Sequence, residues 1–242
     1  MKNSIEVINL SKSYKTKKAV NNISFKIDEN EIVGLLGPNG CGKTTTIGMI
    51  LGLLKPTSGQ VLINGKNIEN NKISILHKMN FISPYIELPK KLTVKQNLIV
   101  YGKLYNIKNL NERINFLSEK LRLADLLDKI TGELSSGQKN RVSLAKALIN
   151  DPTVLLLDEP TAALDPETAD FIRTFLEKLR EEKKISVLLA SHNMDEVKRL
   201  CNSVMMMKDG NIVDGGTPED LIEKYGQKNL EEVFLEIVRK DR

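Results

Sequence analysis

The chain has 242 residues, and 40% of them are hydrophobic, which suits one α/β domain with a helical annex. No apolar run approaches the ~20 residues that cross a bilayer, and Met1 to Leu10 alternates instead of forming the apolar block of a secretory signal. Two cysteines give no disulfide framework, which is typical of a reducing compartment. Without a membrane span or signal, we expect a cytoplasmic protein. The net charge of +5 is spread along the chain without interleaved aromatic residues, so we expect no nucleic-acid partner.

The first predicted elements are strands. Between Ser4 and Ile27, alternating apolar residues such as Ile5 and Val7 predict an antiparallel section. Tyr14 lies between two strand-like runs of this section. A further apolar run from Glu31 to Leu36 is expected to open the core of the domain.

A glycine-rich turn follows that run and precedes a helix that begins near Lys43. Its sequence fits the phosphate-binding pattern G-x-x-x-x-G-K-[ST], in which glycines let successive backbone N–H groups converge on phosphate oxygens. Lys43 is suited to reach the β- and γ-phosphates, and the Thr44 hydroxyl is suited to hold Mg²⁺. The turn therefore predicts a nucleoside triphosphate site formed by Gly37, Pro38, Asn39, Gly40, Cys41, Gly42, Lys43, Thr44 and Thr45. Because Cys41 precedes a helix N-terminus, we expect a reactive thiolate there.

The middle of the chain is predicted to be helical. A strand from Gln60 to Ile63 is expected to continue the core, and residues 93–150 then carry a helical pattern without strand signals. Within this segment, Ser135, Ser136, Gly137 and Gln138 precede a run of apolar residues at helical spacing. Two hydroxyls, a glycine and a helix N-terminus together predict a second anion site, far from the first.

Two buried-type strands follow, each with polar residues at its end. Val154 to Leu157 is continuously apolar and leads into Asp158 and Glu159. Since ligands in open α/β sheets bind at the carboxyl ends of strands, Asp158 is expected to bind Mg²⁺ through its water shell and Glu159 to activate the attacking water. His192 follows the run from Ile185 to Ala190, so we expect it to reach the same ligand edge.

The last predicted elements are a hairpin and two helices. Strands at Ser203 to Met207 and at Ile212 to Val213 flank a Lys-Asp-Gly-Asn turn. Short helices are predicted near Pro218 to Lys224 and Leu230 to Val238.

In order and spacing, these motifs resemble those of ATP-binding cassette (ABC) ATPases over nearly the whole chain. The glycine-rich turn resembles the Walker A motif, Leu134 through Gln138 the signature, and Val154 through Glu159 the Walker B motif. The resemblance implies a P-loop α/β fold of residues 1–242, with a catalytic core at 1–92 and 151–242 and a helical subdomain at 93–150. Its implied ligands are ATP and Mg²⁺.

The resemblance also assigns roles to single residues and partners. Tyr14 resembles the family's adenine-stacking aromatic, Asp165 belongs to a D-loop-like step, and His192 resembles the switch histidine at the γ-phosphate. Two cassettes of the family bind head to tail, so the implied partners are a second cassette and transmembrane permease subunits at the cytoplasmic face of the membrane. The segment Asn229 to Leu235 resembles export-type cassettes, and the implied function is an ATP-hydrolysing exporter subunit.

Two positions depart from the family pattern. Pro84 falls where the family has a glutamine that joins the Mg²⁺ shell, and proline supplies neither a side-chain ligand nor an N–H. A water is expected at that vertex, because Mg²⁺ readily keeps several. Ser136 replaces a usual glycine. The alternatives are a non-transport ABC ATPase acting on nucleic acid or ribosomes, and an inactive cassette, against which Lys43, Asp158, Glu159 and His192 argue.

Overall fold

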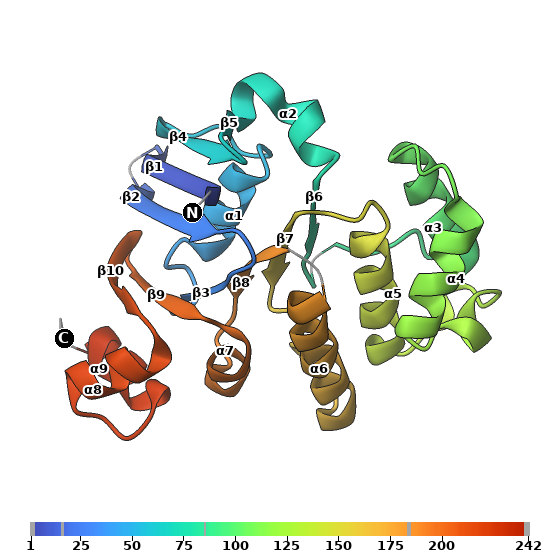
Figure 1. The fold of residues 1–242 in the computed structure, drawn as a ribbon. Coiled ribbons are helices and arrows are strands. Elements are labelled where there is room, and N and C mark those ends of the chain that lie inside the picture. Colours follow the sequence, from blue (N-terminus) through green and yellow to red (C-terminus); the bar gives the residue numbers. More distant parts are fainter. Residues whose placement is uncertain (1–2, 16, 85, 183–184, 240–242) are drawn as a thin grey trace.

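Two β-sheets with surrounding helices make up the chain in the computed structural model, which describes residues 3–15, 17–84, 86–182 and 185–239 (Figure 1). The α/β fold class predicted from the sequence is confirmed. In chain order the strands are β1 (Asn3–Tyr14), β2 (Lys17–Asp28), β3 (Ile32–Leu36), β4 (Ser58–Ile63), β5 (Lys66–Asn67), β6 (Met79–Ile82), β7 (Val154–Asp158), β8 (Ser186–Ala190), β9 (Ser203–Lys208) and β10 (Asn211–Gly216).

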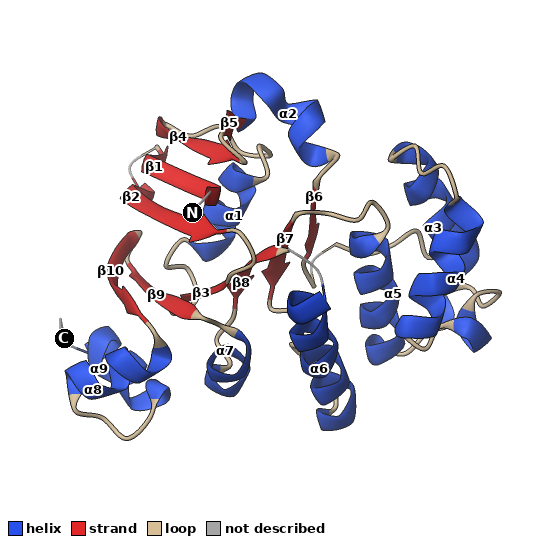
Figure 2. Cartoon of the chain, viewed as in Figure 1, coloured by secondary structure: helices blue, strands red, loops and turns tan. Residues whose placement is uncertain are grey.

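The first sheet is antiparallel, in the order β2-β1-β4-β5 (Figure 2). Its centre is β1, where Ile5 lies opposite both Ile27 of β2 and Ile63 of β4. The strand predicted at Gln60 to Ile63 to continue the core therefore forms, but it lies in this antiparallel sheet and not beside β3. Only Val61 and Ile63 of β4 are buried, an alternation that suits a sheet with one solvent-facing side.

The second sheet carries the nucleotide-binding motifs, in the order β10-β9-β3-β8-β7-β6, with parallel pairing from β9 to β6 and β10 antiparallel at one edge. Its strands β3, β7 and β8 are buried along their whole length, as their largely apolar sequences predict. Their side chains alternate between two apolar clusters. In β7, Leu156 packs with the first sheet and α1 (Lys43–Ile50), while Leu157 packs with the helices of the opposite face.

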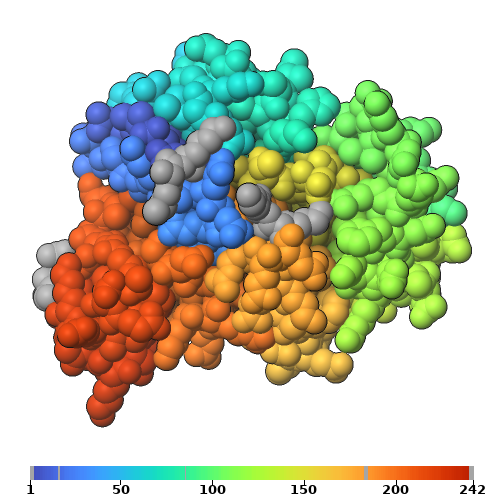
Figure 3. All heavy atoms as spheres, viewed as in Figure 1, coloured from blue at the N-terminus to red at the C-terminus, as the bar shows by residue number. Residues whose placement is uncertain are grey.

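Helices cover the rest of the second sheet. The predicted helical segment contains α3 (Val94–Leu104), α4 (Leu110–Lys120) and α5 (Ser136–Leu148), and the C-terminal helices are α8 (Pro218–Tyr225) and α9 (Leu230–Arg239). The helices α2 (Ile68–Leu76), α6 (Pro166–Glu182) and α7 (Met194–Leu200) have no counterpart among the predicted elements. In the space-filling view, the green residues of the predicted helical segment gather on the side opposite the red C-terminal residues (Figure 3). The division at 92/93 and 150/151 stays a prediction.

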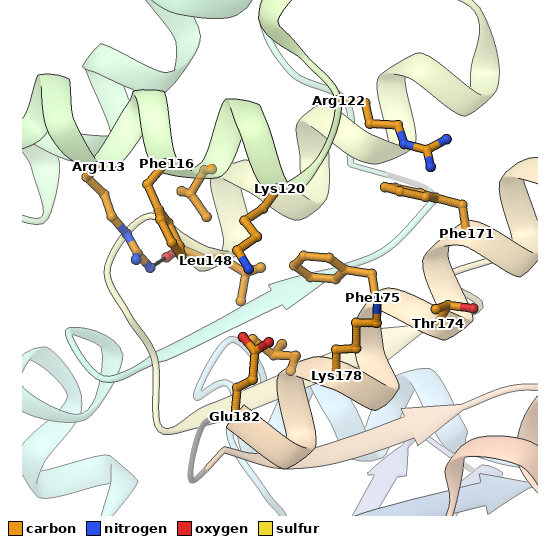
Figure 4. A pocket seen from close by; sticks show the side chains of 12 residues that line it. Arg113, Phe116, Lys120, Arg122, Leu148, Phe171, Thr174, Phe175, Lys178 and Glu182 are labelled. Atoms are coloured by element: carbon orange, nitrogen blue, oxygen red, sulfur yellow. Dashed lines mark hydrogen bonds between the residues drawn. The ribbon is translucent and has the colours of Figure 1, made fainter.

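A groove runs where α4 of the helical subdomain faces α6 of the core (Figure 4). Three phenylalanines, Phe116, Phe171 and Phe175, line it together with basic side chains. Arg122 stacks over Phe171 with 4.7 Å between its Cζ and the ring centroid. The two parts of the chain therefore meet through aromatic and cationic side chains at this groove, while the apolar cluster behind it is continuous from α4 and α5 to β7.

Candidate nucleotide site

The glycine-rich loop between β3 and α1 contains two positions, Gly37 and Gly42, at which only glycine fits. A Cβ on Gly37 would lie 2.3 Å from the carbonyl oxygen of Met207, and one on Gly42, where φ is +117°, would lie 2.5 Å from the carbonyl oxygen of Ala19. Gly40 also has a positive φ, of +79°, but a Cβ at this position would have no atom of another part of the chain within 4 Å. The loop is thus held against the β1–β2 and β9–β10 hairpins by glycine contacts.

Lys43 lies across this loop. Its side chain is only 7% exposed, and its Nζ donates to the carbonyl oxygens of Gly37 at 2.6 Å and Pro38 at 3.3 Å. No side chain caps the N-terminus of α1, and its first turn holds no acidic residue. A buried ammonium beside uncapped helix N–H groups suits an anion, so the residues present fit a phosphate group.

Cys41 points away from the phosphate side. The thiol is 3% exposed and packs in the apolar cluster between the two sheets. Burial raises the pKa of Cys41, and the opposing effects of the Lys43 charge and of backbone N–H groups do not offset it. The expected reactive thiolate is therefore wrong, because the loop turns this side chain into the core instead of toward solvent.

Asp158 lies at the carboxyl end of β7, close to Thr44 of α1. The carboxylate is 4% exposed, and the hydroxyls of Thr44 and Ser83 both hydrogen-bond to it. Burial and then the neighbouring Glu159 raise the pKa of Asp158, and Lys43 acts in the opposite direction. The two predicted magnesium ligands, Thr44 and Asp158, thus come together from different elements as oxygen donors, the ligand type that Mg²⁺ prefers.

Glu159 and His192 meet at the ends of β7 and β8. Glu159 has a left-handed φ of +51°, and its N–H donates to the Ala190 carbonyl oxygen at 2.8 Å. Its carboxylate lies 2.7 Å from His192 Nδ1 and also accepts from the His192 N–H at 3.4 Å. Of the residues predicted for catalysis, which also include Lys43, Glu159 and His192 are therefore in direct contact.

Glu196, on α7 behind this pair, is a polar residue that the sequence pattern did not single out. It is 0% exposed and accepts from Ser191 Oγ at 2.7 Å and Thr161 Oγ1 at 2.8 Å. Burial raises the pKa of Glu196, against the effect of those two hydrogen bonds. The carboxylate thereby joins the segment after Glu159 to the segment that holds His192. Its position three residues after Asn193, the N-cap of α7, was the available signal.

The signature residues form the start of α5. Ser135 and Gln138 make a reciprocal capping box, with the Gln138 N–H donating to Ser135 Oγ at 3.3 Å and the Ser135 N–H to Gln138 Oε1 at 3.0 Å. A Cβ on Gly137 would lie 2.9 Å from Thr168 Oγ1 on α6, and that hydroxyl donates to Asp165 at 2.8 Å. Among the described residues, no hydrogen bond joins Ser135, Gly137 or Gln138 to residues 37–45. Within one chain, the two predicted anion sites are therefore not joined by a hydrogen bond between described residues.

Three further predicted positions complete the site. Tyr14, at the end of β1, is 46% exposed, and Lys12 Nζ lies 5.2 Å from its ring centroid. Asp165 caps α6 through Thr168, whose hydrogen bonds lower the Asp165 pKa. Pro84 follows β6 and lines a cleft with Glu159 and Ser136. The ligand roles of all these residues stay predictions.

Together, the cradle after β3 and the carboxylates after β7 define a P-loop nucleotide-binding protein of the ATPase class. The family model described as "ABC transporter" matches residues 20–162, and the chain belongs to this family. It is an ABC ATPase.

Relatives of known name support this membership. The chain is 34% identical over 224 residues to the ABC transporter ATP-binding protein NatA of Bacillus subtilis, which covers 91% of each chain. It is 36% identical over 230 residues to the choline transport ATP-binding protein OpuBA of Bacillus subtilis, covering 93% of this chain but 60% of the relative. It is 36% identical over 221 residues to the Nod factor export ATP-binding protein I of Burkholderia lata, covering 90% of this chain and 72% of the relative.

Solved structures share the fold. An ATP-binding subunit of an ABC transporter superimposes with a TM-score of 0.88 at 26% identity, covering 96% of this chain and 98% of its own. A dimeric ATP-binding cassette, MJ0796, bound to ADP and phosphate after hydrolysis, has a TM-score of 0.80 at 27% identity, covering 88% and 98%. The alternative of a cassette acting on nucleic acid finds no support in these comparisons. Among the described residues, no helix is both long and apolar enough to cross a membrane.

Proposed function

We propose that this chain is the ATP-hydrolysing subunit of an exporter, working as a pair of cassettes bound to separate transmembrane subunits at the cytoplasmic face of the membrane. The observation that carries the catalytic part is the 2.7 Å contact between His192 Nδ1 and the Glu159 carboxylate, beside Asp158. This contact fixes a base at the strand edge that the phosphate cradle also faces.

In the proposed mechanism, each residue has a local task. The cradle N–H groups and Lys43 bind and orient the phosphates, Tyr14 stacks on the base, and Mg²⁺, when bound by Thr44 and Asp158, offsets phosphate charge. Glu159 orients and deprotonates the attacking water. His192 holds the Glu159 carboxylate through Nδ1 while its ring faces the γ-phosphate edge.

We propose a second cassette because, within the described part of one chain, the signature residues are not joined to the phosphate-binding loop. Ser135, Gly137 and Gln138 present a capped helix start that has no hydrogen bond to residues 37–45 within the described chain. A helix start of this kind suits the γ-phosphate held by a partner cassette. The dimeric form of the similar cassette MJ0796 supports this arrangement.

The direction of transport is the finer part of the proposal. Its support is the export-type pattern of Asn229 to Leu235, which forms the start of α9, together with the similarity to a Nod factor export protein. A methionine import protein of Latilactobacillus sakei is also similar, at 39% identity, so family membership alone carries no direction.

The test is the substitution Glu159→Gln. Because the amide cannot take a proton from water, we expect turnover to fall by roughly 10²- to 10⁴-fold while ATP still binds. The variant should accumulate as an ATP-dependent dimer in light scattering. The matched control is Glu181→Gln on the exposed end of α6, which should behave as the unaltered chain. Near-normal turnover of Glu159→Gln would remove Glu159 from the role of base.

For export, uptake of substrate into inverted vesicles carrying the full complex is the expected result, and uptake into right-side-out vesicles would contradict it.

A further inference from the structure

The hydroxyl of Ser83 lies beside Asp158. Ser83 directly precedes Pro84, the position where the family has a glutamine. The parallel register pairs Ile82, the last residue of β6, with Leu157 of β7, so Ser83 follows β6 beside Asp158, the last residue of β7. The Ser83 hydroxyl hydrogen-bonds to the Asp158 carboxylate, as the Thr44 hydroxyl does from α1. Two hydroxyls from different parts of the chain therefore converge on one carboxylate.

We propose that the Ser83 hydroxyl is a protein ligand of the Mg²⁺ bound with ATP, in the place that Pro84 cannot fill. The inference rests on the magnesium–ATP site of the proposed function. Magnesium requires near-octahedral oxygen coordination at about 2.0–2.1 Å, and Thr44, Asp158 and the phosphates leave positions for a further oxygen or water.

The chemistry of a hydroxyl allows this role without loss of the observed hydrogen bond. A serine hydroxyl has one donor hydrogen and two acceptor lone pairs. Ser83 can therefore keep donating to Asp158 while a lone pair of its Oγ faces the metal. Other hydroxyls of the same cleft, on Ser136 and Ser143, come from α5 and have no hydrogen bond to Asp158.

The experiment separates metal ligation from support of the fold by measuring nucleotide affinity instead of turnover. A fluorescent ATP analogue is titrated into the full chain with excess EDTA and, separately, at rising Mg²⁺ concentrations. For Ser83→Ala we expect unchanged affinity in EDTA and about 10-fold more Mg²⁺ needed for half-maximal enhancement of binding, the usual scale for a lost metal-site group. Ser143→Ala is the matched control, because it removes a hydroxyl from the same cleft and should leave both measurements unchanged.

A second variant tests direct contact. Ser83→Cys should bind the analogue poorly with Mg²⁺ and regain affinity with Cd²⁺, since a thiolate is a soft ligand that Mg²⁺ does not favour. Cadmium binding should add the ultraviolet charge-transfer band of a cadmium–thiolate bond, which the buried Cys41 and Cys201 of the unaltered chain should not give. An unchanged Mg²⁺ requirement in Ser83→Ala, or a Ser83→Cys chain without the band, would overturn the inference. A chain that binds no nucleotide even with Mg²⁺ would instead overturn the proposed function.

Discussion

Lys146 on α5 carries a charge into a site without an opposite charge, and replacing it with methionine should stabilise the protein. Its Nζ lies 5.3 Å from the Phe81 ring centroid and 5.4 Å from that of Tyr101. Its hydrogen bonds within the described chain are long, 3.5 Å to Asn80 Oδ1 and 3.4 Å to the Phe81 carbonyl oxygen. No described carboxylate pairs with it. Burial therefore lowers the pKa of Lys146 from 10.5 to about 8.

The size of the effect follows from proton linkage. The folded-state pKa lies below the unfolded value, so between these two pH values the unfolded chain binds more protons and stability rises with pH. One pKa unit corresponds to about 1.36 kcal/mol, so the charged form costs on the order of 3 kcal/mol at neutral pH. Ring contacts with Lys146 offset part of this cost, by about 0.5–2 kcal/mol. Between pH 8 and pH 10 the linkage should add about 2 kcal/mol to the stability of the unaltered chain.

The assay is urea unfolding of the unaltered chain and of Lys146→Met at several pH values, with reversibility checked at each. Because both proteins share every other titrating group, the difference between their unfolding free energies isolates Lys146. We expect Lys146→Met to be more stable at pH 7 by about 1–3 kcal/mol, with the advantage disappearing toward pH 10. A difference that does not change with pH, or a methionine variant that is less stable at pH 7, would refute the reasoning.

Two further predictions concern the glycines of the phosphate cradle and the two cysteines of the chain. Gly42→Ala should destabilise the fold by roughly 2 kcal/mol or more, because φ at this position is +117° and the added Cβ would lie 2.5 Å from the Ala19 carbonyl oxygen. Gly40→Ala should cost only about 1 kcal/mol, because its φ is +79° and a Cβ there has free space. Equal urea midpoints for the two variants would contradict this. Cys41 and Cys201 should react slowly with a thiol reagent in the native chain and fully in denaturant, because burial raises the pKa of both thiols; rapid native labelling of Cys41 at neutral pH would show that its side chain faces solvent.

The parts of the site that the sequence could predict are those written in consecutive residues. The spacing of glycines, lysine and threonine from Gly37 to Thr45 predicts a phosphate-binding loop. The continuously apolar strand before Asp158 predicts that this carboxylate lies at the ligand edge of the sheet. His192 could be placed for the same reason, because it follows a strand of the same kind. These positions follow from local sequence and from the general rule for parallel sheets.

The parts that could not be predicted depend on pairing between distant segments. β4 joins the first sheet because of its register with β1, and the contact of Ser83 with Asp158 depends on the register of β6 with β7. Neither register is written in the strands themselves. The side-chain direction of Cys41 likewise depends on the turn of its loop toward β9, where a Cβ on Gly37 would meet both Cys41 Sγ and the Met207 carbonyl.

Helix α5 explains how the separated motifs can act on one another within a single chain. Its first turn is the signature, and a turn later Asn140 Nδ2 donates to the Pro160 carbonyl oxygen at 2.7 Å, directly after Glu159. Near its other end Lys146 reaches Phe81, two residues before Ser83. A shift of this helix would therefore move the signature-like turn, the segment after the proposed base and the strand before the proposed magnesium site together. Lys146 is costly to bury, but its donors connect α5 to β6, which a methionine would not do. Stability and coupling between motifs are thus opposed at this residue.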